Sequence, residues 1–514
     1  MAAAGARAHN PPVAWTLLLG LALVKLAIHL LAAGPLAWGY MTDELYFLDS
    51  IDRLDWGFVD HPPLCVAVLG VIRAVGGSSI LAVRVVPALL GAATVVLTGL
   101  MAREMGGGRV AQGLAALAAL SCPVFLAMGM YYSMNPIDQA LWPVAAFVLL
   151  RIVNGGDPRL WLVLGSVMGL GLLNKASMSW FGVGLAVGLI LTPQRRWLRT
   201  PWPWAAAAIA GACFAPFVWW QSQHEWPFFE FSRNAAQFKV GYVSPIDFAL
   251  EQILSANPLT APLWVGGVVF GLASPAARQY RSVVWIFATV FLLLAFSGSA
   301  RPHYLAPAYP MAFAAGAVAV ARQRLQWRWL PMALATGMVL VAVISAPLAM
   351  PLLPPDLTVR YQDALGLRPR EELERGGLLP MHLGLFFHAE AVLAPVLQVY
   401  QRLTPEEQAH VEILTGSFGE TGAINVLGRS RGLPGSIGRH NQYWLWGPGA
   451  ASGELMIVVH DSEKDLHEWF TACERRAEIE CPYCMEIMQH NAVYLCRHPR
   501  RPLAELWPQL KHYR

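Results

Sequence analysis

Acidic side chains cluster in one short segment of this chain. Six of the thirteen acidic residues among the first 350 positions fall between Asp43 and Asp60, directly after the first long apolar segment. A carboxylate beside a lipid bilayer is costly unless it is solvated or functional, and the apolar part of the chain has few others. The segment is therefore the first candidate for chemistry, with a carboxylate as a general base.

The pair Asp43 and Glu44 opens this segment. Thr42 can cap a helix there, and apolar residues then recur every three to four positions, so we expect an amphipathic helix that lies along the membrane surface. Both carboxylates would occupy its first turn, where the helix dipole favours the ionised form that a base requires. Alternatively, the two acids are only caps on a solvated face.

Two further acids have notable neighbours. Asp60 and His61 precede two prolines that fix a rigid, extended backbone, and such a pair suits contact with phosphate or a divalent metal. Asp138 is a lone acid at the mouth of an apolar segment, where it either faces the interior of a helix bundle or caps a helix.

Cations are expected on the same side as these acids, at Arg84, Lys175, Arg301 and His303. Carboxylates and fixed cations in one cavity can attack a phosphate-linked group, because the base takes the proton of the nucleophile and the cations stabilise the departing phosphate. For each cation singly, snorkelling to the lipid headgroups is the alternative.

The composition sets the class of protein. Of 514 residues, 56% are hydrophobic and 14% charged, with a mean hydropathy of +0.44, which indicates an α-helical protein that crosses a membrane many times. The net charge of +4 is small and the basic residues are dispersed, so no nucleic-acid partner is expected.

Apolar windows of about 17–23 residues predict about eleven transmembrane helices. The windows are Val13–Leu36, Ser79–Met101, Val110–Met130, Ile137–Val153, Leu160–Leu173, Ser177–Thr192, Trp202–Gln221, Pro258–Ala273, Val283–Ser297, Tyr304–Ala321 and Trp329–Met350. Arginines fall in alternate loops, which the positive-inside rule assigns to the cytoplasm together with the N-terminus. The acid-rich segment and the C-terminus then lie outside.

The composition changes after Met350. The following 351–514 region carries twenty of the 33 acids and is predicted to be a separate water-soluble α/β domain, with 1–350 as the membrane domain. Strands are expected at His410–Leu414, Leu455–Val459 and Val493–Cys496. The glycines of 416–422 form a tight turn or cradle an anion, and their spacing is not that of a nucleotide site.

Four cysteines lie in this second domain, at Cys473, Cys481, Cys484 and Cys496. An oxidising compartment favours structural disulfides, while a zinc site and free thiols remain alternatives and the pairing stays open.

Several motifs together resemble the C-type (GT-C) glycosyltransferases, specifically the protein O-mannosyltransferase-like family 39 that includes the lipid A aminoarabinose transferases. Their order and spacing match over about residues 40–310. The motifs are Asp43-Glu44-Leu45-Tyr46, Asp60-His61-Pro62-Pro63-Leu64, Arg84 to Gly91, Asn135 to Asp138, Gly171 to Lys175, and Arg301 to Pro307.

The resemblance implies a GT-C fold with outward interfacial helices, in a bacterial inner membrane with a periplasmic C-terminal domain. It also implies a sugar donor carried on a polyprenyl phosphate, and an acceptor that is a lipid, a glycan or a protein. By the same resemblance Asp43 is the catalytic base and Asp138 a second acid, while Asp60 and His61 contact phosphate or a divalent metal, and no other cofactor is implied. The other substrate-binding residues would be Glu44, Arg84, Lys175, Arg301, His303 and Tyr304.

The chain departs from the family pattern at Asn174 and Arg301, which leaves the sugar and the acceptor open. Two other classes of protein are alternatives. A transporter would explain Lys25 within the first span but usually has paired halves, and no internal repeat is present. A sensor with an external ligand-binding domain would leave the acid-rich segment unexplained.

Overall fold

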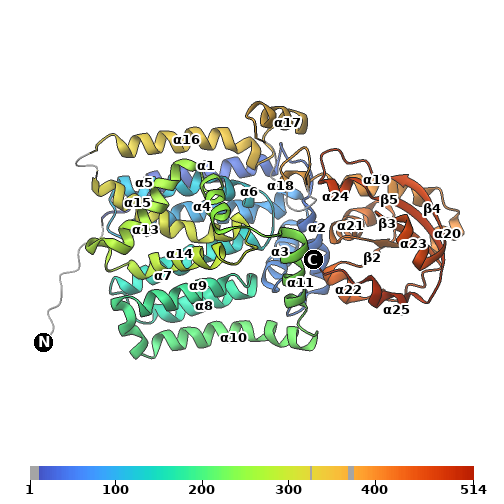
Figure 1. Cartoon of the computed structure of the whole chain (residues 1–514), viewed down its shortest axis with the longest axis horizontal. Coiled ribbons are helices and arrows are strands. Elements are labelled where there is room, and N and C mark those ends of the chain that lie inside the picture. Colours follow the sequence, from blue (N-terminus) through green and yellow to red (C-terminus); the bar gives the residue numbers. More distant parts are fainter. Residues whose placement is uncertain (1–10, 324–326, 368–375, 514) are drawn as a thin grey trace.

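The computed structural model describes residues 11–323, 327–367 and 376–513. A bundle of apolar helices fills its N-terminal part, and the helices run side by side along the long axis of the molecule (Figure 1). The principal ones are α1 (Trp15–Ala33), α4 (Ile80–Glu104), α5 (Arg109–Leu120), α7 (Met134–Val153), α8 (Leu160–Asn174), α9 (Met178–Ile190), α10 (Trp202–Gln223), α13 (Ala261–Ala273), α14 (Arg281–Ala295), α15 (Tyr309–Gln323) and α16 (Leu330–Ala349).

The chain is a multi-pass membrane protein, and every predicted window coincides with helix. By length and composition, seven helices of the described residues can cross a bilayer, or eight if the bent pair Pro245–Ser255 and Pro258–Ala273 forms one span. This number is below eleven because several helices have only 12–15 residues. The Val110–Met130 window, for example, is broken at Cys122, where Pro123 starts the short helix α6 (Pro123–Met128).

Small residues allow the helices of the bundle to approach closely. A methyl group on Gly316 of α15 would overlap the backbone of Leu263 in α13, and one on Gly267 would overlap the backbone of Ala312. This contact fixes α15 together with the turn η6 (Pro302–Ala308), which directly precedes it.

Shorter helices gather at one end of the bundle, next to the C-terminal domain (Figure 1). The segment predicted to carry the chemistry supplies α2 (Thr42–Ser50), and α3 (Leu64–Gly76) follows it. The connection between α10 and α13 adds α11 (Pro227–Ala235), η3 (Ala236–Val240) and α12 (Pro245–Ser255).

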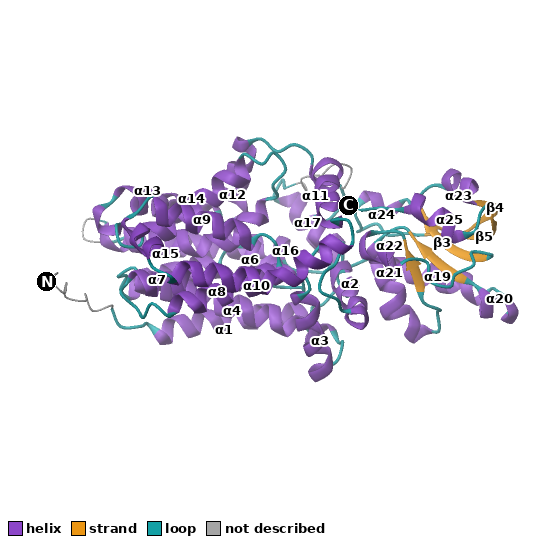
Figure 2. Ribbon diagram, turned by 90° about the horizontal axis from the view of Figure 1, so that it is seen from below, coloured by secondary structure: helices purple, strands orange, loops and turns teal. Residues whose placement is uncertain are grey.

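A five-stranded sheet forms the centre of the C-terminal domain, with helices packed around it (Figure 2). Its strands are β1 (Glu412–Thr415), β2 (Ser436–Gly438), β3 (Leu455–His460), β4 (Phe470–Glu478) and β5 (Ala492–Pro499), in the order β2-β1-β3-β5-β4. β1 runs parallel to β2 and β3, and β5 is antiparallel to β3 and β4.

Three of these strands match the predicted ones. Sequence reasoning missed β2, which has three residues, and β4, an edge strand whose side chains are mostly exposed and polar. α19 (His388–Gln401) is apolar and long enough for its segment to be counted among the seven candidate spans. Its buried side chains Val392, Leu393 and Val396 instead join the core of this domain.

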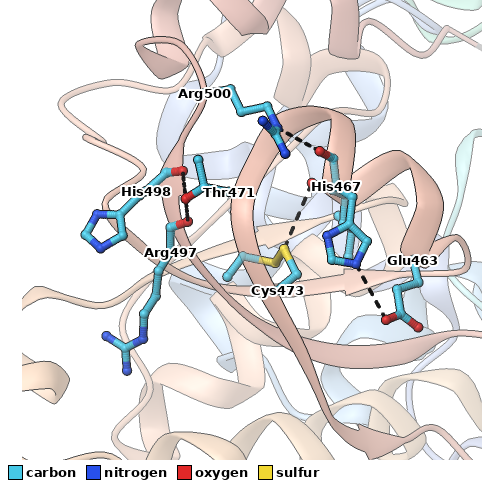
Figure 3. Close-up of a disulfide and its surroundings, with 9 residues drawn as sticks. Glu463, His467, Thr471, Cys473, Arg497, His498 and Arg500 are labelled. Atoms are coloured by element: carbon cyan, nitrogen blue, oxygen red, sulfur yellow. Dashed lines mark hydrogen bonds and ion pairs between the residues drawn. A yellow bond between two sulfur atoms is a disulfide. The ribbon is translucent and has the colours of Figure 1, made fainter.

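Two disulfides form in the C-terminal domain, which confirms the interpretation favoured from the cysteine content. Cys473 and Cys496 join the neighbouring strands β4 and β5 (Figure 3). Cys481 and Cys484, three positions apart in the sequence, form the second disulfide in the connection between β4 and β5.

Candidate active site

Helix α2 is fixed at its start by its own acidic residue. Met41, and not Thr42, occupies the N-cap position, and its backbone N–H donates to Glu44 Oε2 at 2.9 Å. Thr42 is the first helical residue. The predicted cap was therefore wrong by one position, because the reciprocal bond of the capping box comes from Glu44.

Glu44 forms a buried ion pair with Arg84 of α4. Arg84 Nε and Nη2 donate to the two carboxylate oxygens at 2.8 and 2.7 Å, and Arg84 Nη2 also donates to Gly39 O. Tyr132 N–H donates to Glu44 Oε1 at 2.9 Å. Both charged side chains are at most 1% exposed. The pair thus ties α2 to the bundle, and neither residue lines the cavity described below.

The outer face of α2 packs against α21 (Phe418–Ala423) of the C-terminal domain. A methyl group on Gly422 would lie 3.0 Å from the backbone of Leu45, and one on Gly419 would lie 2.9 Å from Thr42. Asp49 accepts hydrogen bonds from Asn425 and Tyr443 at 2.8 Å each. Helix α2 is therefore buried between bundle and domain, and its apolar side chains pack against protein.

A cavity of about 350 Å³ lies between the end of the bundle and the C-terminal domain. On the bundle side Asp43 projects from α2, Asn135 from the start of α7, Lys239 from η3, and Arg301 and His303 from the start of η6. The bundle side also includes Met41, Thr42, Met128 and Tyr131. The C-terminal domain adds Met381, His382, Leu385, 416–420, Arg439, His440, 459–461, Met485, Ile487, Met488, Asn491 and His512.

Opposing effects set the ionisation of Asp43. Burial raises its pKa to about 6, and the charges of Asp60 and Glu44 act in the same direction. Lys239 and Arg301 act in the opposite direction, because an adjacent cation favours the carboxylate form. A carboxyl group with a pKa near 6 is ionised at neutral pH and still basic enough to accept a proton.

Lys239 is a site residue that the sequence reasoning missed. It is one of only five lysines in the chain, and it lies in the segment between α10 and α13, to which no structure was assigned. The rarity of lysine in the membrane part was the available signal.

Two predicted site residues, Lys175 and Asp138, lie behind the wall of the cavity. Lys175 Nζ donates to Asn135 Oδ1 at 2.8 Å and lies 5.4 Å from the ring centre of Tyr304. Asp138 is 1% exposed and accepts hydrogen bonds from Trp142 and Ser177. Of these residues only Asn135 reaches the cavity.

Asp60 and His61 also lie outside the cavity lining. Tyr46 donates a hydrogen bond of 2.8 Å to Asp60, and the buried ring of His61 stacks on Phe58 with centres 4.7 Å apart. The described residues contain no group of three or more His, Cys, Asp or Glu side chains placed to hold a metal ion.

Known proteins share features of both the sequence and the fold. The family of dolichyl-phosphate-mannose-protein mannosyltransferases matches residues 60–220. The lipid A galacturonosyltransferase RgtD of Rhizobium johnstonii is 22% identical over 274 residues, which are 52% of this chain. The chain spans about 57% of the length of that relative.

Two crystal structures of ArnT from Cupriavidus metallidurans superpose over 94% of this chain. The apo structure has a TM-score of 0.61 at 17% identity and is covered over 97% of its length. The structure bound to undecaprenyl phosphate has a TM-score of 0.58 at 16% identity and is covered over 98%. These findings confirm the predicted GT-C fold and the resemblance inferred from the motifs.

Proposed function

We propose that this chain, with its mannosyltransferase-family region at 60–220 and the fold of ArnT, is a membrane glycosyltransferase. In this proposal it moves a sugar from a polyprenyl phosphate to an acceptor hydroxyl. The observation that carries the proposal is the placement of Asp43, Lys239 and Arg301 around one cavity. It supplies a base and two cations within reach of a single sugar phosphate.

The reaction is an inverting displacement in one step. The acceptor oxygen forms a bond to the anomeric carbon while the bond from that carbon to the phosphate oxygen breaks. Asp43 takes the proton of the acceptor hydroxyl, and the electron pair of the broken bond remains on the lipid phosphate. Lys239 and Arg301 stabilise the charge that builds up there.

The bundle side of the cavity suits a lipid-linked donor. Met41 and Met128 contribute flexible apolar surface next to the charged groups, and thioether side chains adapt well to irregular apolar ligands. The ArnT structure that contains undecaprenyl phosphate has the same fold. A polyprenyl phosphate would place its phosphate near Arg301 and its first isoprene units against the methionines.

We also assign the cavity to the external face of the membrane. Asn135 at the start of α7 lines the cavity, whereas Arg151 lies in the last turn of that helix. The start of α15 follows the cavity residues Arg301 and His303, and its last turn carries Arg322. The arginines thus mark the opposite end of the bundle, which the positive-inside rule places in the cytoplasm. In a bacterium this topology gives an inner-membrane protein with a periplasmic C-terminal domain.

The test compares envelope lipids and glycoproteins by mass spectrometry in cells that lack the gene and in cells that carry wild-type, D43N or D52N protein. Asp43→Asn keeps the shape but removes the base, so the modification should fall by about 100-fold or more. Asp52 is 65% exposed and pairs with Arg73, so D52N is the matched control. Full modification by D43N protein would refute the assignment of Asp43.

A further inference from the structure

The C-terminal domain places the ends of three parallel strands at the cavity. β1 ends at Thr415 and continues into Gly416, β2 ends at Gly438 and continues into Arg439, and β3 ends at His460. Gly416, Arg439 and His460 all line the cavity. The carboxyl ends of neighbouring parallel strands are where open α/β sheets bind their ligands.

The strand order also points to a ligand crevice beside β1. β1 comes first in the chain, β2 pairs on one side of it and β3 on the other. The chain therefore reverses its direction of travel across the sheet at β1. Such a reversal opens a crevice beside the carboxyl end of the first strand, and ligands occupy it in doubly wound folds.

Trp469 holds two cavity residues from different strands close together. The guanidinium carbon of Arg439 lies 5.6 Å from the centre of its indole ring. The ring of His460 meets the same indole edge to face, with ring centres 5.2 Å apart. A positive charge and an imidazole are thus positioned by contact with one indole ring, as binding groups require.

His460 has a polar atom without a partner. The side chain is 2% exposed, and Ser462 N–H donates to its Nδ1 at 2.9 Å. Asp461 Oδ1 also lies 3.1 Å from Nδ1, so Nδ1 either accepts from Ser462 or donates to Asp461. Nε2 is buried with no hydrogen-bond partner among the described residues. A buried polar atom without a partner is costly, so this atom indicates a missing ligand.

The neighbouring acids already have their own contacts. Glu420 accepts hydrogen bonds from the backbone N–H groups of Gly416 and Ser417 at 2.9 Å each, and from Asn491 at 2.6 Å. Asp461 has a side chain that is 57% exposed and lies 3.1 Å from His460 Nδ1, on the ring edge away from Nε2. The amides of the 416–417 turn are therefore already paired, whereas His460 Nε2 has no partner among the described residues.

We propose that the C-terminal domain is an oxyanion-binding module that holds the acceptor through a phosphate or carboxylate group on Arg439 and His460. A group held there shares the cavity with Asp43. Its identification as part of the acceptor rests on the proposed function, whereas the binding of an oxyanion does not. The module would explain why the domain closes the cavity.

The test measures binding of inorganic phosphate and of glucuronate to the purified full-length protein by isothermal titration calorimetry. Arg439→Gln should weaken binding by about tenfold or more, because a hydrogen bond to a charged group is lost. His460→Ala should do the same, while His460→Gln should retain binding, since the Gln amide nitrogen replaces Nε2. Arg500→Gln is the matched control, because Arg500 lies in the same domain and donates to His467 O.

Comparison with Arg301→Gln locates the bound anion. Binding lost in R439Q and H460A but kept in R301Q supports a separate site on the C-terminal domain. Binding lost only in R301Q, or unchanged in R439Q and H460A, overturns the proposal. The preference for phosphate or glucuronate identifies the kind of oxyanion. None of these outcomes depends on turnover, so they are distinct from a failure of the D43N test.

Discussion

Glu44 and Arg84 face each other through two hydrogen bonds of 2.8 and 2.7 Å in the buried contact between α2 and α4. Adjacent to this pair, Asp43 turns into the cavity. Two consecutive acids thus have different surroundings: Glu44 holds the helix, and Asp43 faces the cavity as the proposed base.

Removal of this ion pair should destabilise the protein. Glu44→Gln leaves the Arg84 guanidinium buried without its counter-charge, so the apparent unfolding free energy should fall by about 3–5 kcal/mol. Thermal unfolding in detergent measures the effect. Arg73→Gln is the control, because it breaks the exposed contact with Asp52 and should cost less than about 1 kcal/mol. Equal losses in both variants would contradict the assigned role of Glu44.

The rate should depend on pH through Asp43, whose pKa lies at about 6. A base acts when it is deprotonated, so kcat/KM should be level above this pH and fall about tenfold per pH unit below it. Lys239 lowers the pKa of Asp43, so Lys239→Gln should move the acidic limb to higher pH. Lys464→Gln, at an exposed position of the C-terminal domain, should leave the limb in place. An unshifted limb in K239Q would show that the two groups do not interact.

Lys175 should affect turnover through Asn135, which separates it from the cavity. Loss of a charge-assisted hydrogen bond allows the amide to move, so Lys175→Gln should lower kcat/KM by about tenfold. Steady-state kinetics with wild-type, K175Q and N135A protein provide the measurement. If Lys175 acts only through Asn135, the double variant should be no slower than N135A alone, whereas additive losses would assign Lys175 a separate role.

The two disulfides should differ in their effect on activity. The Cys481 to Cys484 bond directly precedes Met485, Met488 and Asn491, which line the cavity. Serine substitution of this pair should mainly lower activity, with only a small loss of thermal stability. Serine substitution of Cys473 and Cys496, which join β4 to β5 away from the cavity, should cost about 2–5 kcal/mol of stability. Equal loss of activity in both double variants would contradict this distinction.

Much of the fold could be predicted from local patterns. Apolar windows located the helices of the bundle, and short apolar runs located β1, β3 and β5. The motifs also identified Asp43 and Arg301, which the structure places on one cavity.

The remaining contacts in and around the site could not be predicted because they depend on distant partners. Nothing local to Glu44 shows that Arg84, forty positions away, will bury it. To predict that Arg439 and His460 lie together at the cavity, one needs the order of the strands, which a sequence pattern does not contain. The position of Lys239 at the cavity depends on the path of the connection between α10 and α13, which local sequence patterns do not give.

The burial of α2 has a consequence for biosynthesis. Asn425 and Tyr443, which bond to Asp49 of this helix, follow Asp49 in the chain by 376 and 394 positions. Until these residues have been made, the helix lacks its contacts with the C-terminal domain. The cavity between bundle and domain therefore closes late in maturation, and a chain truncated before these residues leaves that end of the bundle open.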